Sequence, residues 1–143
     1  MESDKFSRPE IRQRLDLART EITLRKPDQA LQLLESSRDD VKRTEIGVLV
    51  AEHRLLLAEA FGLMGDQSAE SLFSEALDLI AKLEQPNAEL EMRANEHFAD
   101  YLIKFAARPL NAREYILAAN RIAIREGLEN ESIRLGMKTV LTY

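Results

Sequence analysis

Apolar residues recur along most of the chain at intervals of three and four, the spacing that places side chains on one face of an α-helix. The first such stripe contains Ile11, Leu15, Ala18 and Ile22. No useful run alternates apolar and polar residues with the period of two that a half-buried strand needs, and no Asn-Gly hairpin turn occurs. The pattern therefore predicts an all-α fold.

Capping residues, prolines and glycines divide the chain into about seven antiparallel helices. Ser7 and Glu10 have the S-x-x-E spacing of a capping box, so the first helix should begin near Arg8. Proline cannot continue the helical hydrogen-bond ladder, and glycine suits a left-handed helix end. Breaks are expected at Lys26-Pro27-Asp28, Lys42-Arg43-Thr44, Gly65-Asp66, Gln85-Pro86-Asn87, Arg108-Pro109-Leu110 and Gly127.

The helices form three pairs, at about 8–43, 45–85 and 88–127, followed by a C-terminal helix at about 131–141. The helix over 45–64 is apolar almost all round, so we expect it to pack on several sides. Ser68 is expected to cap the fourth helix, and Asn111 with Glu114 the sixth. The inward stripe of the fifth helix is expected to contain Ala94, Phe98, Tyr101, Leu102 and Phe105.

The corner between the third and fourth helices has a distinctive order of small and large residues. It contains Leu57, Ala58, Phe61, Gly65, Ala69, Phe73, Ala76 and Leu77. This resembles the tetratricopeptide repeat (TPR), in which small residues allow two helices to approach and an aromatic fills the gap beside them. The marker alanines Ala30, Ala69 and Ala112 lie 39 and 43 residues apart, longer than the TPR period of 34. The resemblance therefore implies a long-repeat, TPR-like single domain; a helical bundle without repeats is the alternative.

Composition limits the classes of function. The 143 residues suit one domain, and the absence of cysteine excludes disulfides and thiolate sites. A net charge of −5 argues against general nucleic-acid binding, which requires neutralisation of phosphates. No run of 18 apolar residues predicts a membrane span, and the charged N-terminus does not read as a secretory signal. We expect a cytoplasmic protein that binds neither nucleic acid nor membrane.

The sequence offers no persuasive catalytic, cofactor or metal site. The two histidines, His53 and His97, each follow a glutamate, and adjacent side chains on a helix do not converge on one ion. Both histidines are therefore expected on helix surfaces. Neither a G-x-S-x-G elbow nor a phosphate-binding glycine loop occurs. The chain is predicted not to be an enzyme and to need no cofactor; an enzyme or a helical bundle that binds a small molecule is a further alternative.

The TPR resemblance implies that the first helix of each pair lines a concave groove that binds a protein or peptide. The candidate residues on these helices are Arg12, Arg19, Glu52, Glu59, Leu63, Arg93, Glu96, His97, Asp100 and Lys104. An alternative is that the two arginines form ion pairs with the two glutamates of the third helix. TPR domains that hold the carboxylate end of chaperone tails use lysine, arginine and asparagine. The equivalent positions here are Leu15, Arg19 and Leu56, so no such clamp is predicted.

The C-terminal helix has two possible roles. Ile133, Met137, Val140 and Leu141 are expected to cover the apolar face of the last pair, as terminal repeats do. The same helix is alternatively expected to pack on a second copy and form a homodimer. The main functional expectation is a non-catalytic scaffold, adaptor or sensor module, and the alternative is a homo-oligomerisation module.

Overall fold

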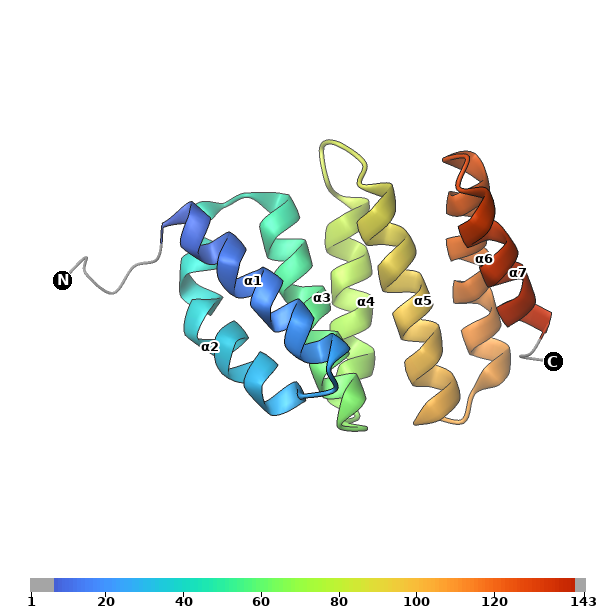
Figure 1. Ribbon diagram of the computed structural model, residues 1–143, viewed down its shortest axis with the longest axis horizontal. Coiled ribbons are helices and arrows are strands. Elements are labelled where there is room, and N and C mark those ends of the chain that lie inside the picture. The colour runs from blue at the N-terminus through green and yellow to red at the C-terminus, as the bar shows by residue number, and fades with distance from the viewer. Residues whose placement is uncertain (1–6, 141–143) are drawn as a thin grey trace. The chain divides into compact units, whose positions relative to one another are not determined.

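A computed structural model describes residues 7–140, which form seven helices and no strand, so the predicted all-α fold is confirmed (Figure 1). The helices are α1 (Arg8–Thr23), α2 (Pro27–Thr44), α3 (Gly47–Leu63), α4 (Ser68–Ala81), α5 (Ala88–Lys104), α6 (Pro109–Arg125) and α7 (Glu129–Val140). Two compact units divide the chain: unit 1, residues 1–79, and unit 2, residues 80–143. Across residues 7–140, no helix is both long and apolar enough to cross a membrane.

Local sequence sets most of the helix ends. The Ser7 hydroxyl accepts a hydrogen bond from the Glu10 N–H, and the Glu10 carboxylate accepts one from the Ser7 N–H, which completes the predicted capping box. Gly65 follows α3 with φ +68°, the left-handed conformation that glycine adopts at little cost. The predicted breaks at Pro27 and Pro109 are the first residues of α2 and α6.

Two of the predicted caps are wrong. Ser68 is the first residue of α4 itself, and the acceptor is the Asp66 carboxylate, 2.9 Å from the Ser68 N and 2.7 Å from its Oγ. Asn111 and Glu114 form no capping box, because α6 already begins at Pro109, whose fixed φ suits the first helical position. The preceding residue, Arg108, has no side-chain cap bond.

The core of unit 1 forms around α3, which contacts both α1 and α2. Its fully buried cluster contains Ile11, Leu15, Ala18, Ala30, Leu34, Val41, Leu56, Leu57 and Ala60. Leu72 of α4 packs against this cluster, and Arg54 of α3 lies 3.4 Å from Glu75 of α4. Helix α3 is therefore surrounded by three helices within its own unit, as its apolar circumference predicts.

The core of unit 2 lies between α5 and α6, where the rings of Phe98 and Tyr115 have centroids 4.5 Å apart. Phe98, Leu102 and Ile116 are buried. The expectation that Phe105 points inward is wrong, because α5 ends at Lys104 and Phe105, the C-cap, is exposed. Its ring lies 6.0 Å from that of Tyr101, so it covers the end of the helix instead.

Helix α7 packs against α6, but with the opposite face to the one predicted. Leu135 is fully buried, whereas Ile133 and Met137 are 57% and 66% exposed. The prediction that Ile133 and Met137 cover the last pair is therefore wrong. Leu141 lies outside the described residues, and so does the side chain of Val140. Residues half a turn from Leu135 point away from the core of their own unit.

Candidate functional site

In unit 1, two of the candidate polar residues bind each other. The Arg12 guanidinium on α1 contacts both carboxylate oxygens of Glu52 on α3, with 2.9 Å between Nη1 and Oε1. Arg12 also donates to Asp16 one turn along α1, at 3.0 Å. The hydrogen bond to Glu52 raises the pKa of Arg12, so the arginine is charged at any physiological pH. The predicted inter-helix ion pair is confirmed for Arg12 and Glu52.

The other unit 1 candidates differ in their exposure. Arg19 is exposed, Leu63 is half-buried, and Glu59 is buried at 5% exposure. A buried carboxylate cannot lie on an open recognition surface, although it can support one from beneath. The pairing of Arg19 with Glu59 stays a prediction.

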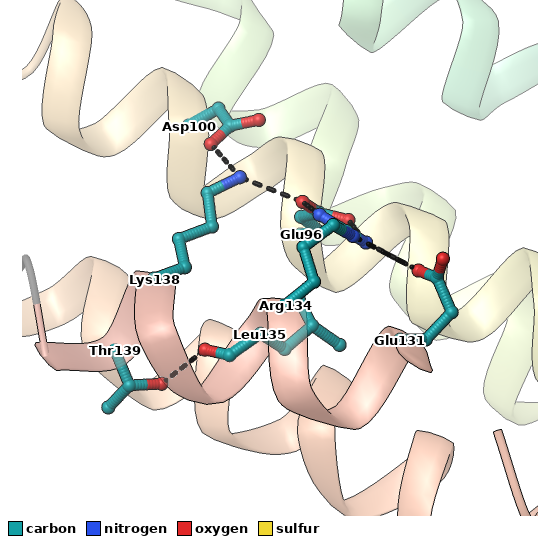
Figure 2. A network of polar contacts seen from close by, with 7 residues as sticks. All are labelled: Glu96, Asp100, Glu131, Arg134, Leu135, Lys138 and Thr139. Atoms are coloured by element: carbon teal, nitrogen blue, oxygen red, sulfur yellow. Dashed lines mark hydrogen bonds and ion pairs between the residues drawn. The ribbon is translucent and has the colours of Figure 1, made fainter. Parts of the chain in front are cut away.

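In unit 2, candidate residues of α5 are bound by α7 (Figure 2). Arg134 donates to Glu96 with 2.7 Å between Nη2 and Oε1, and Lys138 donates to Glu96 with 2.8 Å between Nζ and Oε2. Lys138 also lies 2.6 Å from Asp100 Oδ1, and Arg134 lies 2.6 Å from Glu131 Oε2. These five residues form what we call the α5/α7 ion-pair network.

The Glu96 carboxylate is the centre of this network electrostatically as well as geometrically. Burial disfavours its charge, but the hydrogen bonds from Arg134 and Lys138 outweigh burial and lower the pKa of Glu96 to about 2. Burial also opposes the charge of Lys138, yet Asp100 and Glu96 raise its pKa. Glu96 and Lys138 are thus both charged at neutral pH, and their ion pair helps to hold α7 against α5.

The remaining unit 2 candidates are Arg93, His97 and Lys104. Arg93 and His97 are half-buried on α5, and Lys104 is the exposed last residue of that helix. The structure therefore brings Glu96 and Asp100 together with α7 instead of leaving them to face a ligand.

Sequence reasoning missed Arg134 and Lys138, although a signal was present. Glu96 and Asp100 are four residues apart, and so are Arg134 and Lys138. Residues at this spacing share one helix face, so the two pairs match in spacing and oppose in charge. Matching charged pairs between predicted neighbouring helices would have found the network.

His53 is not on a helix surface, contrary to the prediction. It is 4% exposed, and its Nε2 lies 2.8 Å from the Leu34 carbonyl oxygen of α2. A carbonyl only accepts, so Nε2 carries the hydrogen and donates. Burial lowers the pKa of His53, which keeps the ring neutral and makes it a polar link between α2 and α3.

Large apolar side chains gather on the outer faces of α6 and α7. Leu110, Ile124, Ile133 and Met137 are exposed and Leu117 is half-buried. Leu110, Leu117 and Ile124 are spaced seven apart along α6, so they form one line on that helix. We call these five residues the α6/α7 apolar surface.

A hydrogen bond joins the two helices that carry these residues. Ser132 of α7 donates to Asn120 of α6 at 2.8 Å. Asn120 lies three residues after Leu117 and four before Ile124, so the apolar line of α6 runs beside the junction with α7. Ile133 directly follows Ser132 on the α7 side of the same junction.

The polar groups described in residues 7–140 are side chains on helices, most of which form ion pairs or hydrogen bonds with one another. Within this range no group of three histidine, cysteine or acidic side chains is placed to hold a metal ion. Comparisons of the chain with protein-family models, with curated proteins and with solved structures find no match.

Proposed function

We propose that this chain is a non-catalytic protein-binding module of the cytoplasm, with a TPR-like organisation. The repeated packing supports the TPR-like part of the proposal. In unit 1 α3 packs on the α1–α2 pair, and in unit 2 α7 packs on α6 and binds α5 through ion pairs. The absence of cysteine is compatible with a reducing compartment.

The observation that carries the proposal is the α6/α7 apolar surface. Leu110 and Ile124, like the two exposed residues of α7, are more than half exposed. Complete burial of a side chain of this size contributes roughly 1.5–3 kcal/mol, so their exposure leaves several kcal/mol of hydrophobic free energy unused. Single exposed apolar residues are ordinary, but several on one face of a helix, as on α6 and again on α7, mark a surface that another protein covers.

The polar candidates are a weaker basis for recognition. Arg12 and Glu52 satisfy each other, and Glu96 is held by two cations of its own unit. A partner that recognised these groups would first have to break existing charge-assisted hydrogen bonds, which are among the stronger polar contacts in proteins. The polar faces of α1 and α5 therefore stay second candidate surfaces, each within its own unit, with the exposed cations Arg19 on α1 and Lys104 on α5.

Site-directed crosslinking tests the proposal, because the chain has no cysteine of its own. A photo-crosslinker attached to Met137→Cys should join the protein to a partner in a native lysate. The same reagent on Gln32→Cys, an exposed position of α2, is the matched control. Products specific to position 137 support a binding surface on α7, and identical products from both positions would refute it.

A further inference from the structure

The surface of α5 and α6 beneath α7 has the chemistry of a binding site for a basic helix. Helix α7 packs against α6 and turns Arg134, Leu135 and Lys138 inward (Figure 2). Leu135 is fully buried, both cations contact Glu96 of α5, and Lys138 also contacts Asp100. The resident helix thus shows which ligand the surface fits. It is a helix in which an apolar residue follows an arginine and a lysine comes four positions after that arginine.

The contacts that hold α7 on this surface are few. Of the side chains at residues 129–139, only Leu135 is apolar and fully buried, whereas α3 buries Leu56 and Leu57 side by side in unit 1. Helix α7 binds α5 through ion pairs, and the side chain of Arg134 is 46% exposed. Salt screens exposed ion pairs, and each of them contributes modestly to stability. The docking of α7 therefore depends largely on one buried apolar side chain and on charges that solvent reaches.

Gly136 weakens α7 without a packing reason. It lies within the helix, and a Cβ added to it would meet no atom within 4 Å, so an alanine would fit. Glycine is nevertheless the poorest helix former after proline. Helix α7 has 12 residues, a length at which an isolated helix is marginal in water even with a favourable sequence. Helix α7 should therefore unfold whenever it leaves α5 and α6, and each departure uncovers Glu96 and Asp100 together.

The charges of α5 favour a cationic ligand. Acidic side chains outnumber basic ones on this helix: Glu89, Glu91, Glu96 and Asp100 against Arg93 and Lys104. Glu96 and Asp100 are four residues apart on one face, so without α7 they form a like-charge pair, which destabilises a helix. An apolar helix would cover both carboxylates without pairing them, and covering an unpaired charge is costly. The uncovered surface therefore selects a helix with two cations over an apolar or acidic one.

We propose that α7 is a displaceable occupant of this surface and that a basic helix of another protein binds there in its place. The incoming helix presents its arginine to Glu96, its apolar side chain where Leu135 now lies, and its lysine to Glu96 and Asp100. While α7 is docked it closes the site, because both helices need the same carboxylates. Leu135 and Met137 lie on opposite faces of α7, so this site is separate from the exposed face of α7 and stands without the proposed function.

Binding of a peptide to the full chain tests the proposal. The probe is a fluorescent peptide with capped ends and the sequence of residues 128–140. In the chain with Arg134→Glu and Lys138→Glu, α5 repels the resident helix, so the site is open. This open chain should bind the peptide at least about tenfold more tightly than the wild type, in which the tethered α7 competes at a high effective concentration. Adding Glu96→Gln to the open chain should remove this gain.

Two controls separate the site from general attraction between charges. Arg38→Glu with Lys42→Glu makes the same change of charge at the same spacing on exposed positions of α2, and it should leave peptide binding as in the wild type. A peptide in which the two cations are themselves changed to glutamate should not bind the open chain. A peptide with alanine in place of Gly136 should bind roughly fivefold more tightly, because it forms the helix more readily.

Hydrogen exchange in the wild type gives a second measurement, which needs no variant that could fail to fold. An excess of unlabelled peptide should speed the exchange of the amides over 129–140 in the isotope-labelled chain, because the displaced helix unfolds. Amides of α2 should be unaffected. Raising NaCl from about 0.1 M to about 1 M should act on the same α7 amides in the same direction, because it screens the exposed ion pairs.

Two results would overturn the proposal. One is α7 exchange in the wild type that excess peptide leaves unchanged. The other is an open chain whose α5 and α6 amides stay protected but which binds the peptide no better than the wild type. The proposed function is read separately, from crosslinks at position 137, which lies on the face of α7 that this site does not include.

Discussion

Replacing Glu96 with glutamine should loosen α7 more than any other single change of charge in unit 2. Glu96 accepts from both Arg134 and Lys138, and its pKa is lowered from 4.5 to about 2. At about 1.4 kcal/mol for each unit of pKa, this shift sets an upper limit of about 3 kcal/mol on its electrostatic contribution. The side chains of Arg134 and Lys138 are 46% and 26% exposed, so screening by solvent reduces the expected cost to about 1–2 kcal/mol.

Hydrogen exchange of the α7 amides measures this loss where it occurs. A cost of 1–2 kcal/mol should make exchange over residues 129–140 roughly 5–30 times faster in Glu96→Gln than in the wild type. Glu114→Gln, at an exposed position of α6, is the control and should leave these rates unchanged. Because the pKa of Glu96 is lowered on folding, its contribution should be present above pH 4.5 and be lost as the pH falls towards 2. Equal exchange rates in the two variants would refute the central role of Glu96.

Three further predictions concern other parts of the chain. Because the pKa of His53 is lowered on folding, the free energy of unfolding should fall as the pH drops below about 6.5. Chemical denaturation at pH 7.5 and 5.5 should show a smaller difference in this free energy for His53→Gln than for the wild type. Alanine at Gly127, where φ is +71°, should cost about 1 kcal/mol, whereas alanine at Gly136, where a Cβ meets no atom, should stabilise the fold by up to about 1 kcal/mol. Thermal unfolding of the two variants compares them. Arg12→Gln should lower the free energy of urea unfolding by about 1 kcal/mol, because it leaves the half-buried Glu52 without its partner. Arg38→Gln, which removes an exposed ion pair, is the control and should cost less than about 0.5 kcal/mol.

The helices and most of their buried faces could be predicted from the sequence because those signals are local. The capping box at Ser7, the prolines at helix starts and Gly65 each act within a few residues. The stripe of α1 is buried as predicted, since Ile11, Leu15 and Ala18 leave only one apolar face to choose. The prediction for Phe105 failed because α5 ends at Lys104, before the expected break at Arg108-Pro109, and residues 105–107 between them contain neither glycine nor proline.

The candidate site was predicted less well because it depends on contacts between helices. Helix α7 offers two possible inward faces, one with Ile133 and Met137 and one with Leu135. Apolar side chains favour the first face, whereas the structure buries Leu135 and turns Arg134 and Lys138 towards α5. Predicting the buried face of α7 therefore requires knowing where Glu96 lies in space, and the sequence pattern of α7 alone does not contain that information.

The ion pair between α1 and α3 and the one between α5 and α7 have opposite polarity, which should disfavour the exchange of a helix between the two units. In unit 1 the cation is on the first helix and the anion on the third; in unit 2 the anion is on the first and the cation on the third. If α7 docked on α1 and α2 in place of α3, Arg134 would meet Arg12. If α3 docked on α5 and α6, Glu52 would meet Glu96. An exchange that kept these positions would place like charges together and would lose both ion pairs, so each third helix should favour its own unit. A chimera in which α3 and α7 are exchanged should therefore fold stably only if the charges at the positions of Glu52 and Arg134 are reversed as well.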